Sequence, residues 1–237
     1  MRHFLTVGLL FFSLSCFAEI SKITEGIYIS DLPSAREKKA LRDSRITHIM
    51  DLGRGNRDIF SKIPSLPKND FYTLDDLKEK FVYIDLPTMD RPEFPIEGYF
   101  IPVNRTLRKI LRNPENKVLV HCDQGISRSV TVVISHLMRE GMRLENAIHL
   151  VQRKRPVAEP NQGFFAKLLG LDERLQKRVD RLSYSIDQQF PDHGMTENDI
   201  RQALAKSNWN PEKGLRSLME LNAANMLVEL GVMEALQ

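Results

Sequence analysis

The chain has 237 residues, of which 42% are apolar and 27% are charged, a balance that is ordinary for a globular protein. This length suits one domain of about 150 residues and a smaller appendage. The formal net charge of +3 is too small to favour binding to nucleic acid or to a membrane surface.

The first 18 residues have the pattern of an export signal. Arg2 precedes the apolar run Phe4–Phe12, and small residues follow before Ala18. This order is typical of a cleavable secretory signal, so we expect cleavage after Ala18 and a secreted or periplasmic protein. The run is short for a bilayer, so we expect no transmembrane span in the mature chain. A lipid anchor on Cys16 is disfavoured, because Ser13 stands where such sites usually carry Leu.

The predicted cleavage determines which cysteines remain in the mature chain. The two cysteines are Cys16 and Cys122, so removal of the signal would leave Cys122 alone. No intramolecular disulfide could then form, and the fold would rest on its apolar core. A lone thiol in an exported protein is a candidate reactive group.

The first third of the chain alternates predicted strands and helices. Apolar, β-branched runs predict strands, and a polar segment with spaced Ala and Leu predicts a short helix. In order, the predicted elements are a strand at Gly26–Ser30, a helix at Ser34–Asp43, and strands at Ile46–Leu52 and Phe81–Leu86. The intervening Gly53–Lys80 is long for a connection, so we interpret it as a lid or a partly ordered excursion.

The middle of the chain carries the clearest helix signal. In Pro95–Arg112, apolar residues recur every three or four positions and give one apolar face. Val118–Val120 is a short, wholly apolar strand, as at the centre of a parallel sheet. Three further helices are predicted. The first runs from the end of the stretch His121–Ser129 to Gly141, and the others lie at Leu144–Lys154 and Asn161–Arg181. The alternation predicts an α/β domain over residues 19–181, with a central, mostly parallel sheet flanked by helices.

Composition shifts at Leu182, and no strand-like run follows it. Apolar residues instead recur at helical spacing. The three predicted helices centre on Ile200–Leu204, Gly214–Met219 and Met226–Leu230. We therefore expect a small, all-helical C-terminal module over residues 182–237.

The stretch with the strongest chemical signal is His121–Ser129 (HCDQGISRS), between a predicted strand and a predicted helix. Backbone N–H groups in such a turn form a nest for a tetrahedral oxyanion, and the helix dipole adds to it. Gly125 lets the backbone close tightly, and Arg128 can hold two phosphate oxygens. The same positive potential favours the thiolate of Cys122, a nucleophile aimed at bound phosphate. A Cys after a buried strand is more often an inert core thiol, but the full set of residues favours the reactive interpretation.

The motif resembles the dual-specificity branch of the protein tyrosine phosphatase superfamily, whose loop reads H-C-x-x-G-x-x-R-S. The resemblance covers residues 20–175 and includes ITHIMDL, DRPEFPIEGYF and EPNQGFFAKL. It implies a two-step reaction in which Cys122 attacks phosphorus and expels the substrate oxygen, and water then hydrolyses the phosphocysteine. No cofactor and no metal is implied, and the histidine spacing resembles no metal site.

A proton donor for the leaving oxygen is needed in the first step. Asp90 matches the family's general-acid position, and its carboxylate would serve as general base for water in the second step. Asp85 is the alternative, although it closes a predicted strand and an ordinary turn role would explain it. Placement in a loop favours Asp90.

The resemblance also assigns supporting roles. Ser129 would donate a hydrogen bond to the Cys122 sulfur, a role that is compatible with capping the following helix. His121 would support the loop, and Asn161, in the Pro-Asn-x-Gly-Phe pattern, would brace it. Phosphate would be held by Arg128 and by the backbone N–H groups of Asp123, Gln124, Gly125, Ile126 and Ser127.

The substrate class is predicted from the variable loop positions. They carry an acid and no extra base, which favours a phosphoprotein over an inositol lipid. No segment resembles a deep phosphotyrosine-recognition loop, so the resemblance implies a shallow pocket for phosphotyrosine and phosphoserine/threonine. The basic run Arg153–Arg155 could attract acidic substrate, or could be a solvated helix end. A phosphoinositide or other non-protein phosphatase, a phosphate-binding pseudoenzyme adaptor and a rhodanese-like sulfurtransferase stay open as alternatives.

Thr196–Met219 weakly resembles the three-helix ubiquitin-associated or CUE-type fold, through Ala203-Leu204, Asn208-Trp209-Asn210 and Leu215 with Leu218. This would imply ubiquitin or another protein as a partner. The alternative is a helical extension packed on the phosphatase domain, with Trp209 as a core anchor.

Overall fold

The computed structural model describes residues 19–53, 70–191 and 193–229, the last eight of these by their backbone alone. The predicted export signal and most of the predicted 53–80 excursion lie outside the described residues. Within the described ranges, no helix combines the length and the apolar content needed to span a bilayer.

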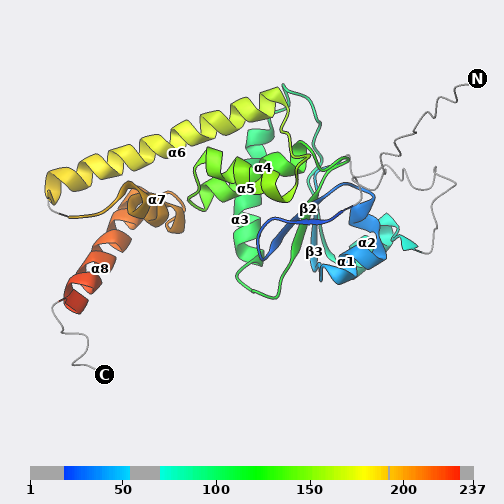
Figure 1. Ribbon diagram of the computed structural model, residues 1–237, viewed down its shortest axis with the longest axis horizontal. Coiled ribbons are helices and arrows are strands. Elements are labelled where there is room, and N and C mark those ends of the chain that lie inside the picture. The colour runs from blue at the N-terminus through cyan, green and yellow to red at the C-terminus, as the bar shows by residue number, and fades with distance from the viewer. Residues whose placement is uncertain (1–18, 54–69, 192, 230–237) are drawn as a thin grey trace, which may run out of the picture.

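A five-stranded sheet in the order β1-β2-β5-β3-β4 organises the fold (Figure 1). The strands are β1 (Ser21–Lys22), β2 (Ile27–Ser30), β3 (His48–Asp51), β4 (Val82–Asp85) and β5 (Val118–His121). All neighbouring pairs are parallel except β1 with β2, which confirms the predicted mostly parallel sheet. Strand β1 was not predicted, because its two polar residues carry no strand pattern.

The three central strands of the sheet, β2, β5 and β3, are largely buried on both faces, whereas Val82 of the edge strand β4 is exposed. Alternate strand residues point to opposite sides. Ile29, Met50 and Val120 belong to the larger core, whereas Ile49 and Leu119 belong to a second, smaller one. The fold is therefore a layer of sheet between two layers of helix, as the wholly apolar run of β5 predicts.

Short helices cover the smaller core: η2 (Ser34–Arg36), α1 (Lys38–Asp43) and α2 (Leu74–Lys80). The predicted single helix at Ser34–Asp43 is wrong, because Glu37 has an extended backbone, with ψ of 116°, between η2 and α1. The end of the predicted excursion is also helical. Thr73 and Asp76 form a capping box that starts α2, a local signal that the interpretation as a lid overlooked.

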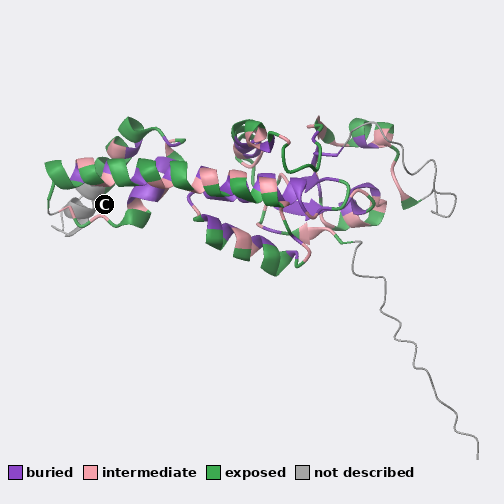
Figure 2. Cartoon of the chain, turned by 90° about the horizontal axis from the view of Figure 1, so that it is seen from above, coloured by how far each residue is buried: buried purple, intermediate pink, exposed green. Residues whose placement is uncertain are grey.

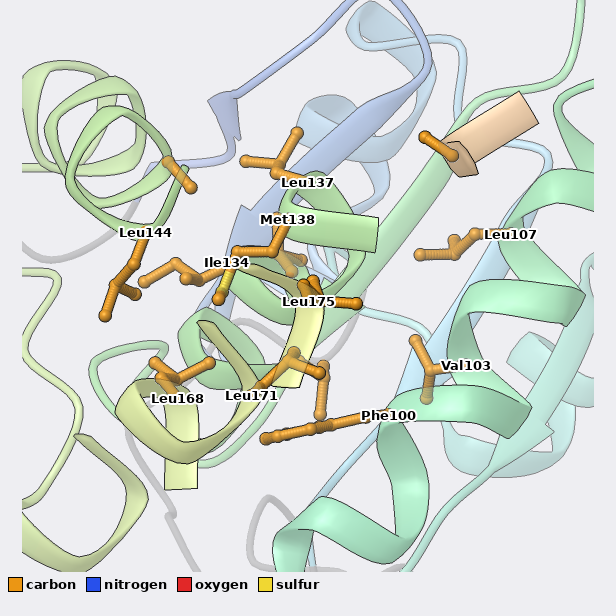
Figure 3. Packing of buried hydrophobic residues seen from close by; sticks show 14 of the residues in the cluster. Phe100, Val103, Leu107, Ile134, Leu137, Met138, Leu144, Leu168, Leu171 and Leu175 are labelled. Carbon is orange, nitrogen blue, oxygen red and sulfur yellow. The ribbon is translucent and has the colours of Figure 1, made fainter. Parts of the chain in front are cut away.

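Longer helices cover the larger core: η5 (Ile96–Tyr99), α3 (Phe100–Ile110), α4 (Arg128–Arg139), α5 (Leu144–Lys154) and α6 (Gln162–Gln189). The predicted helix at Pro95–Arg112 thus begins as a 3₁₀ turn. Figure 3 shows how side chains from these helices meet in this core. Phe100, Val103 and Leu107 of α3 lie on one side, with α4 and α6 side chains opposite them (Figure 3).

The helix α6 continues past the end predicted at Arg181. It has 28 residues, and Val179, Leu182 and Ile186 extend its buried stripe across the composition shift. The apolar spacing is therefore uninterrupted where the overall composition changes. Figure 2 shows buried residues recurring along this long helix while its other faces are exposed. The predicted domain boundary at 181/182 falls inside α6.

The C-terminal region contains α7 (Glu197–Lys206) and α8 (Pro211–Glu229). Three helices were predicted here, but α8 spans the second and reaches into the third. Figure 1 shows the chain turning back from the far end of α6 to α7, from which α8 extends toward the C-terminus. Ile200, Trp209 and Leu218 join the same core cluster as the sheet. The described part of this region is thus a helical extension packed on the α/β unit.

Candidate active site

Strand β5 lies between its two parallel neighbours, β2 and β3, and the loop that follows β5 leads into the first turn of α4. Cys122 is 1% exposed and comes directly after the strand. Gly125 has φ of +65°, and a Cβ there would lie 2.4 Å from the Ser30 carbonyl oxygen. Only glycine fits this turn, which brings the loop back over its own start.

The Cys122 sulfur lies among hydrogen-bond donors. The Gly125 N–H donates to Sγ at 3.2 Å, and the Ser129 Oγ lies 3.4 Å from it. Ser127 is the N-cap residue of α4, so Ser129 stands in the first turn rather than at the cap. Hydrogen-bond donors and the positive end of α4 therefore surround the sulfur.

Arg128 is buried, and its guanidinium is held from three directions. Nη1 donates to the carbonyl oxygens of Leu52 at 3.2 Å and Thr88 at 3.3 Å. Nη2 donates to Asp123 Oδ2 at 2.9 Å. Burial lowers the pKa of Arg128, but the negative charges of Cys122, Asp123 and Asp90 outweigh it and raise the pKa above its usual value. The cation is therefore fixed beside the thiol.

Asp90 reaches the same loop from the segment after β4. Its Oδ1 accepts hydrogen bonds from Ser127 Oγ and Asn161 Nδ2, both at 2.8 Å. Its Oδ2 lies 3.6 Å from Arg128 Nε. Asp85, the alternative acid, ends β4, and within the described ranges it makes no hydrogen bond or ion pair with the loop. The fold thus places Asp90, rather than Asp85, beside Arg128.

Asn161 joins the loop, the Asp90 segment and α6. Its side chain accepts from the Phe164 N–H at 3.0 Å and so caps α6. Its own N–H donates to Ser127 Oγ at 3.2 Å. Gly163 lets the two segments approach, because a Cβ there would lie 2.0 Å from the Pro92 carbonyl oxygen. Asn161 was predicted as a site residue and Gly163 was not, although both belong to one Pro-Asn-x-Gly-Phe pattern.

His121 lies behind the loop. It is fully buried, and its Nε2 lies 3.8 Å from Asp51 Oδ1. Asp51 also accepts from the Gly53 N–H at 2.6 Å and from the Tyr83 hydroxyl at 2.5 Å. Burial raises the pKa of Tyr83, and the Asp51 charge adds to this. Asp51 thus links β3 to β4 near their carboxyl ends, and His121 at the end of β5 lies beside it.

Arg155, the residue that ends α5, braces the loop, a position that was not predicted from the sequence. It is 5% exposed, so the interpretation of Arg153–Arg155 as a solvated helix end does not hold for it. Its Nε donates to the Gly125 carbonyl at 2.6 Å, and its Nη2 donates to the Gln124 carbonyl at 3.3 Å. Holding these carbonyls outward helps to turn the loop N–H groups inward. Arg153 and Lys154 are exposed.

The remaining variable positions contribute mainly backbone. Gln124 is exposed, and the Ile126 carbonyl accepts from the Glu159 N–H at 2.9 Å. Ser127 and Asp123 also use their side chains, to hold Asp90 and Arg128 respectively. Among the described residues, no cluster of three or more His, Cys, Asp or Glu side chains could hold a metal ion.

Comparisons with known proteins agree with the resemblance to dual-specificity phosphatases. Residues 27–174 match the family model described as dual specificity phosphatase, catalytic domain. The dual specificity protein phosphatase 13B of Mus musculus is 34% identical over 164 residues, which cover 69% of this chain and 77% of that protein. The dual specificity protein phosphatase 1 of Arabidopsis thaliana is 34% identical over 157 residues, covering 66% and 70%.

Solved structures share the fold. A mouse dual specificity phosphatase crystallised with zinc tungstate superposes with a TM-score of 0.56 at 25% identity, covering 72% of this chain and 96% of that one. Another solved relative, DUSP15, gives a TM-score of 0.52 at 25% identity, covering 68% and 97%.

Proposed function

The chain belongs to the dual specificity phosphatase family, and we propose that its loop from Cys122 to Ser129 hydrolyses phosphate monoesters through a phosphocysteine on Cys122. Membership makes it a cysteine-based protein phosphatase of the tyrosine and serine/threonine class. One observation carries the residue assignments. The Cys122 thiol, the Arg128 guanidinium and the Asp90 carboxylate converge on one loop at the carboxyl end of the sheet.

In the first step the loop N–H groups and Arg128 bind the phosphate oxygens. The Cys122 thiolate attacks phosphorus, so that an S–P bond forms as the P–O bond to the substrate breaks. Asp90 gives its proton to the leaving oxygen. Since Ser127 and Asn161 both donate to Oδ1, Oδ2 is the oxygen left to carry that proton.

In the second step the Asp90 carboxylate takes a proton from water, and the water oxygen attacks phosphorus as the S–P bond breaks. The departing electron pair returns to the Cys122 sulfur. Ser129 Oγ, 3.4 Å away, can donate a hydrogen bond to that sulfur and stabilise the thiolate as it leaves.

The proposed substrate is a phosphoprotein carrying phosphotyrosine or phosphoserine/threonine. Asp123 supports this over an inositol lipid, because its carboxylate lies beside the phosphate-binding Arg128 and would repel further phosphate groups on the same ligand. No side chain other than Arg128 among those of the loop carries a positive charge.

The decisive experiment is turnover of an aryl phosphate and of a panel of phosphopeptides and phosphoinositides. We expect Cys122→Ser to abolish turnover while retaining phosphopeptide binding. Normal turnover by Cys122→Ser would exclude the mechanism. Phosphopeptide binding without turnover by the native chain would indicate a pseudoenzyme adaptor, and faster turnover of phosphoinositides than of any phosphopeptide would reassign the substrate class.

We also propose that the chain is exported by residues 1–18. The support is the sequence pattern of a basic start, an apolar run and small residues before Ala18. N-terminal sequencing of the protein recovered from outside the producing cell's cytoplasm tests this, and an intact Met1 on that protein would contradict cleavage.

Ubiquitin stays a predicted partner of the C-terminal helices, on the weak resemblance alone. Trp209, which contributes to the resemblance, is 1% exposed and donates from Nε1 to the Arg139 carbonyl at 2.9 Å. Any binding would therefore use the exposed faces of α7 and α8. Titration of the chain with ubiquitin, with heat or chemical-shift changes as the signal, tests this prediction, and the absence of any signal would exclude ubiquitin as the partner.

A further inference from the structure

A second concave site lies at the other end of α4 from the Cys122 loop. It has a volume of about 800 Å³ and is lined by the C-terminal half of α3, the end of α4 and the α7–α8 connection. The 12 residues of α4 place it about 18 Å from the catalytic loop. Six cationic side chains line this basic pocket: Arg105, Arg108, Lys109, Arg112, Lys206 and Lys213.

Most of this charge has no partner in the fold. Among the described residues of the lining, Glu140 is the only acidic one, and its carboxylate is already used by Arg108 Nε at 3.0 Å and Asn104 Nδ2 at 2.8 Å. Arg108 also donates to the Ala205 carbonyl at 3.1 Å. The other five cations are exposed and make no ion pair within the described residues. A chain with a net charge of only +3 thus concentrates positive potential at one hollow.

The geometry of the pocket depends on the packing of the C-terminal helices. Trp209 donates to Arg139 at the end of α4, and Arg178 of α6 donates to the Trp209 carbonyl at 2.6 Å. Asn208 and Trp209 both have positive φ, 52° and 62°, so the turn between Lys206 and Lys213 is sharply bent. These contacts bring cations from segments far apart in the sequence to the lining of one open pocket.

We propose that the basic pocket binds a polyphosphorylated group, as in an inositol polyphosphate or the phosphoinositide headgroup that shares its chemistry. The volume suits a small ligand. Cations on separate helices require several anionic groups on one ligand, and the arginines can grip phosphate in bidentate fashion. Leu111 is the only aliphatic residue among the described residues of the lining, so this lining offers few of the apolar anchors that a bound protein segment needs.

The test is binding of inositol hexakisphosphate to the full chain carrying Cys122→Ser, measured by calorimetry at two salt concentrations. The pocket variant Lys109→Gln/Lys213→Gln should lose at least about fivefold in affinity and show a weaker salt dependence. The matched control Lys78→Gln/Lys80→Gln removes two exposed lysines of α2 and should bind as the parent does. Turnover of an aryl phosphate by the pocket variant without the Cys122 change should be unchanged, which shows that the fold and the catalytic loop are intact.

Two further arms separate the outcomes. Inositol hexakisphosphate binding should survive Arg128→Ala; loss there with no loss in the pocket variant would place the ligand in the catalytic loop and overturn the proposal. Equal loss in the α2 control, or tighter binding of a polyglutamate peptide than of inositol hexakisphosphate, would overturn it also. Vesicles of phosphatidylcholine with phosphatidylinositol bisphosphate then identify the source. Binding that depends on Lys109 and Lys213 indicates a lipid headgroup, and soluble binding alone indicates a free polyphosphate.

Discussion

Asp123 provides the sharpest test of how the loop recognises phosphate. Its carboxylate accepts from Arg128 Nη2 at 2.9 Å, the group that we assign to a substrate phosphate oxygen. A phosphate dianion must therefore displace Asp123 from Arg128 or bind beside its negative charge. We expect Asp123→Asn to lower KM for an aryl phosphate and to leave kcat nearly unchanged, because the carboxylate opposes binding in the ground state and the transition state alike.

The size of the expected change in KM follows from the solvent exposure of the Asp123 side chain. The Asp123 side chain is 47% exposed, so solvent screens most of its charge and the pair with Arg128 is worth no more than about 1 kcal/mol. The expected change in KM is thus about threefold to fivefold, and the free energy of unfolding should fall by less than about 1 kcal/mol, since two backbone carbonyls still hold Arg128.

Steady-state kinetics at low and high salt provide the assay. The KM effect should shrink as salt rises, because exposed charges are screened. Gln124→Ala is the matched control, since this exposed neighbour does not contact Arg128 through its side chain. A raised KM in Asp123→Asn would refute the reasoning, because it would mean that Asp123 positions Arg128 for phosphate rather than competing with phosphate.

Four other changes test the site and the fold. Asp90→Asn should lower kcat by about 10²–10⁴-fold, whereas Asp85→Asn should leave it unchanged; comparable losses would exclude the assignment of the acid. Gly163→Ala should destabilise the chain by about 1–3 kcal/mol in denaturant unfolding, because its Cβ would meet the Pro92 carbonyl, whereas Gly98→Ala, with no atom within 4 Å, should stay within about 0.5 kcal/mol. Trp209→Ala should cost about 3–5 kcal/mol if the C-terminal helices belong to the core, and a loss under about 1 kcal/mol would make them an independent appendage. Burial, with the nearby Arg108 charge, lowers the pKa of His136 from 6.5 to about 4, so the unfolded chain takes up this proton first and stability should fall as pH drops between those values. That loss amounts to at most about 3 kcal/mol and should be smaller in His136→Gln, as unfolding at several pH values would show.

Local features account for what could be predicted from the sequence. The catalytic loop is contiguous, and its strand, glycine, arginine and helix start are each recognisable within a few residues of Cys122. The strands and most helices also carry their own periodicity, which depends on neighbours in the chain alone. The end of α6 was predicted too early, at Arg181, because the composition changes at Leu182. The apolar spacing, which continues to Ile186, was the better signal.

Contacts between distant segments needed the tertiary structure. Nothing near Arg155 in the chain indicates that its guanidinium turns inward to the Gly125 carbonyl, and nothing near Asp123 indicates that it occupies Arg128. The choice between Asp85 and Asp90 could be argued from the sequence, but the distances to Arg128 come from how the segment after β4 packs on α6. The basic pocket could be found only from the tertiary structure, because its cations lie on elements that the packing of Trp209 brings together.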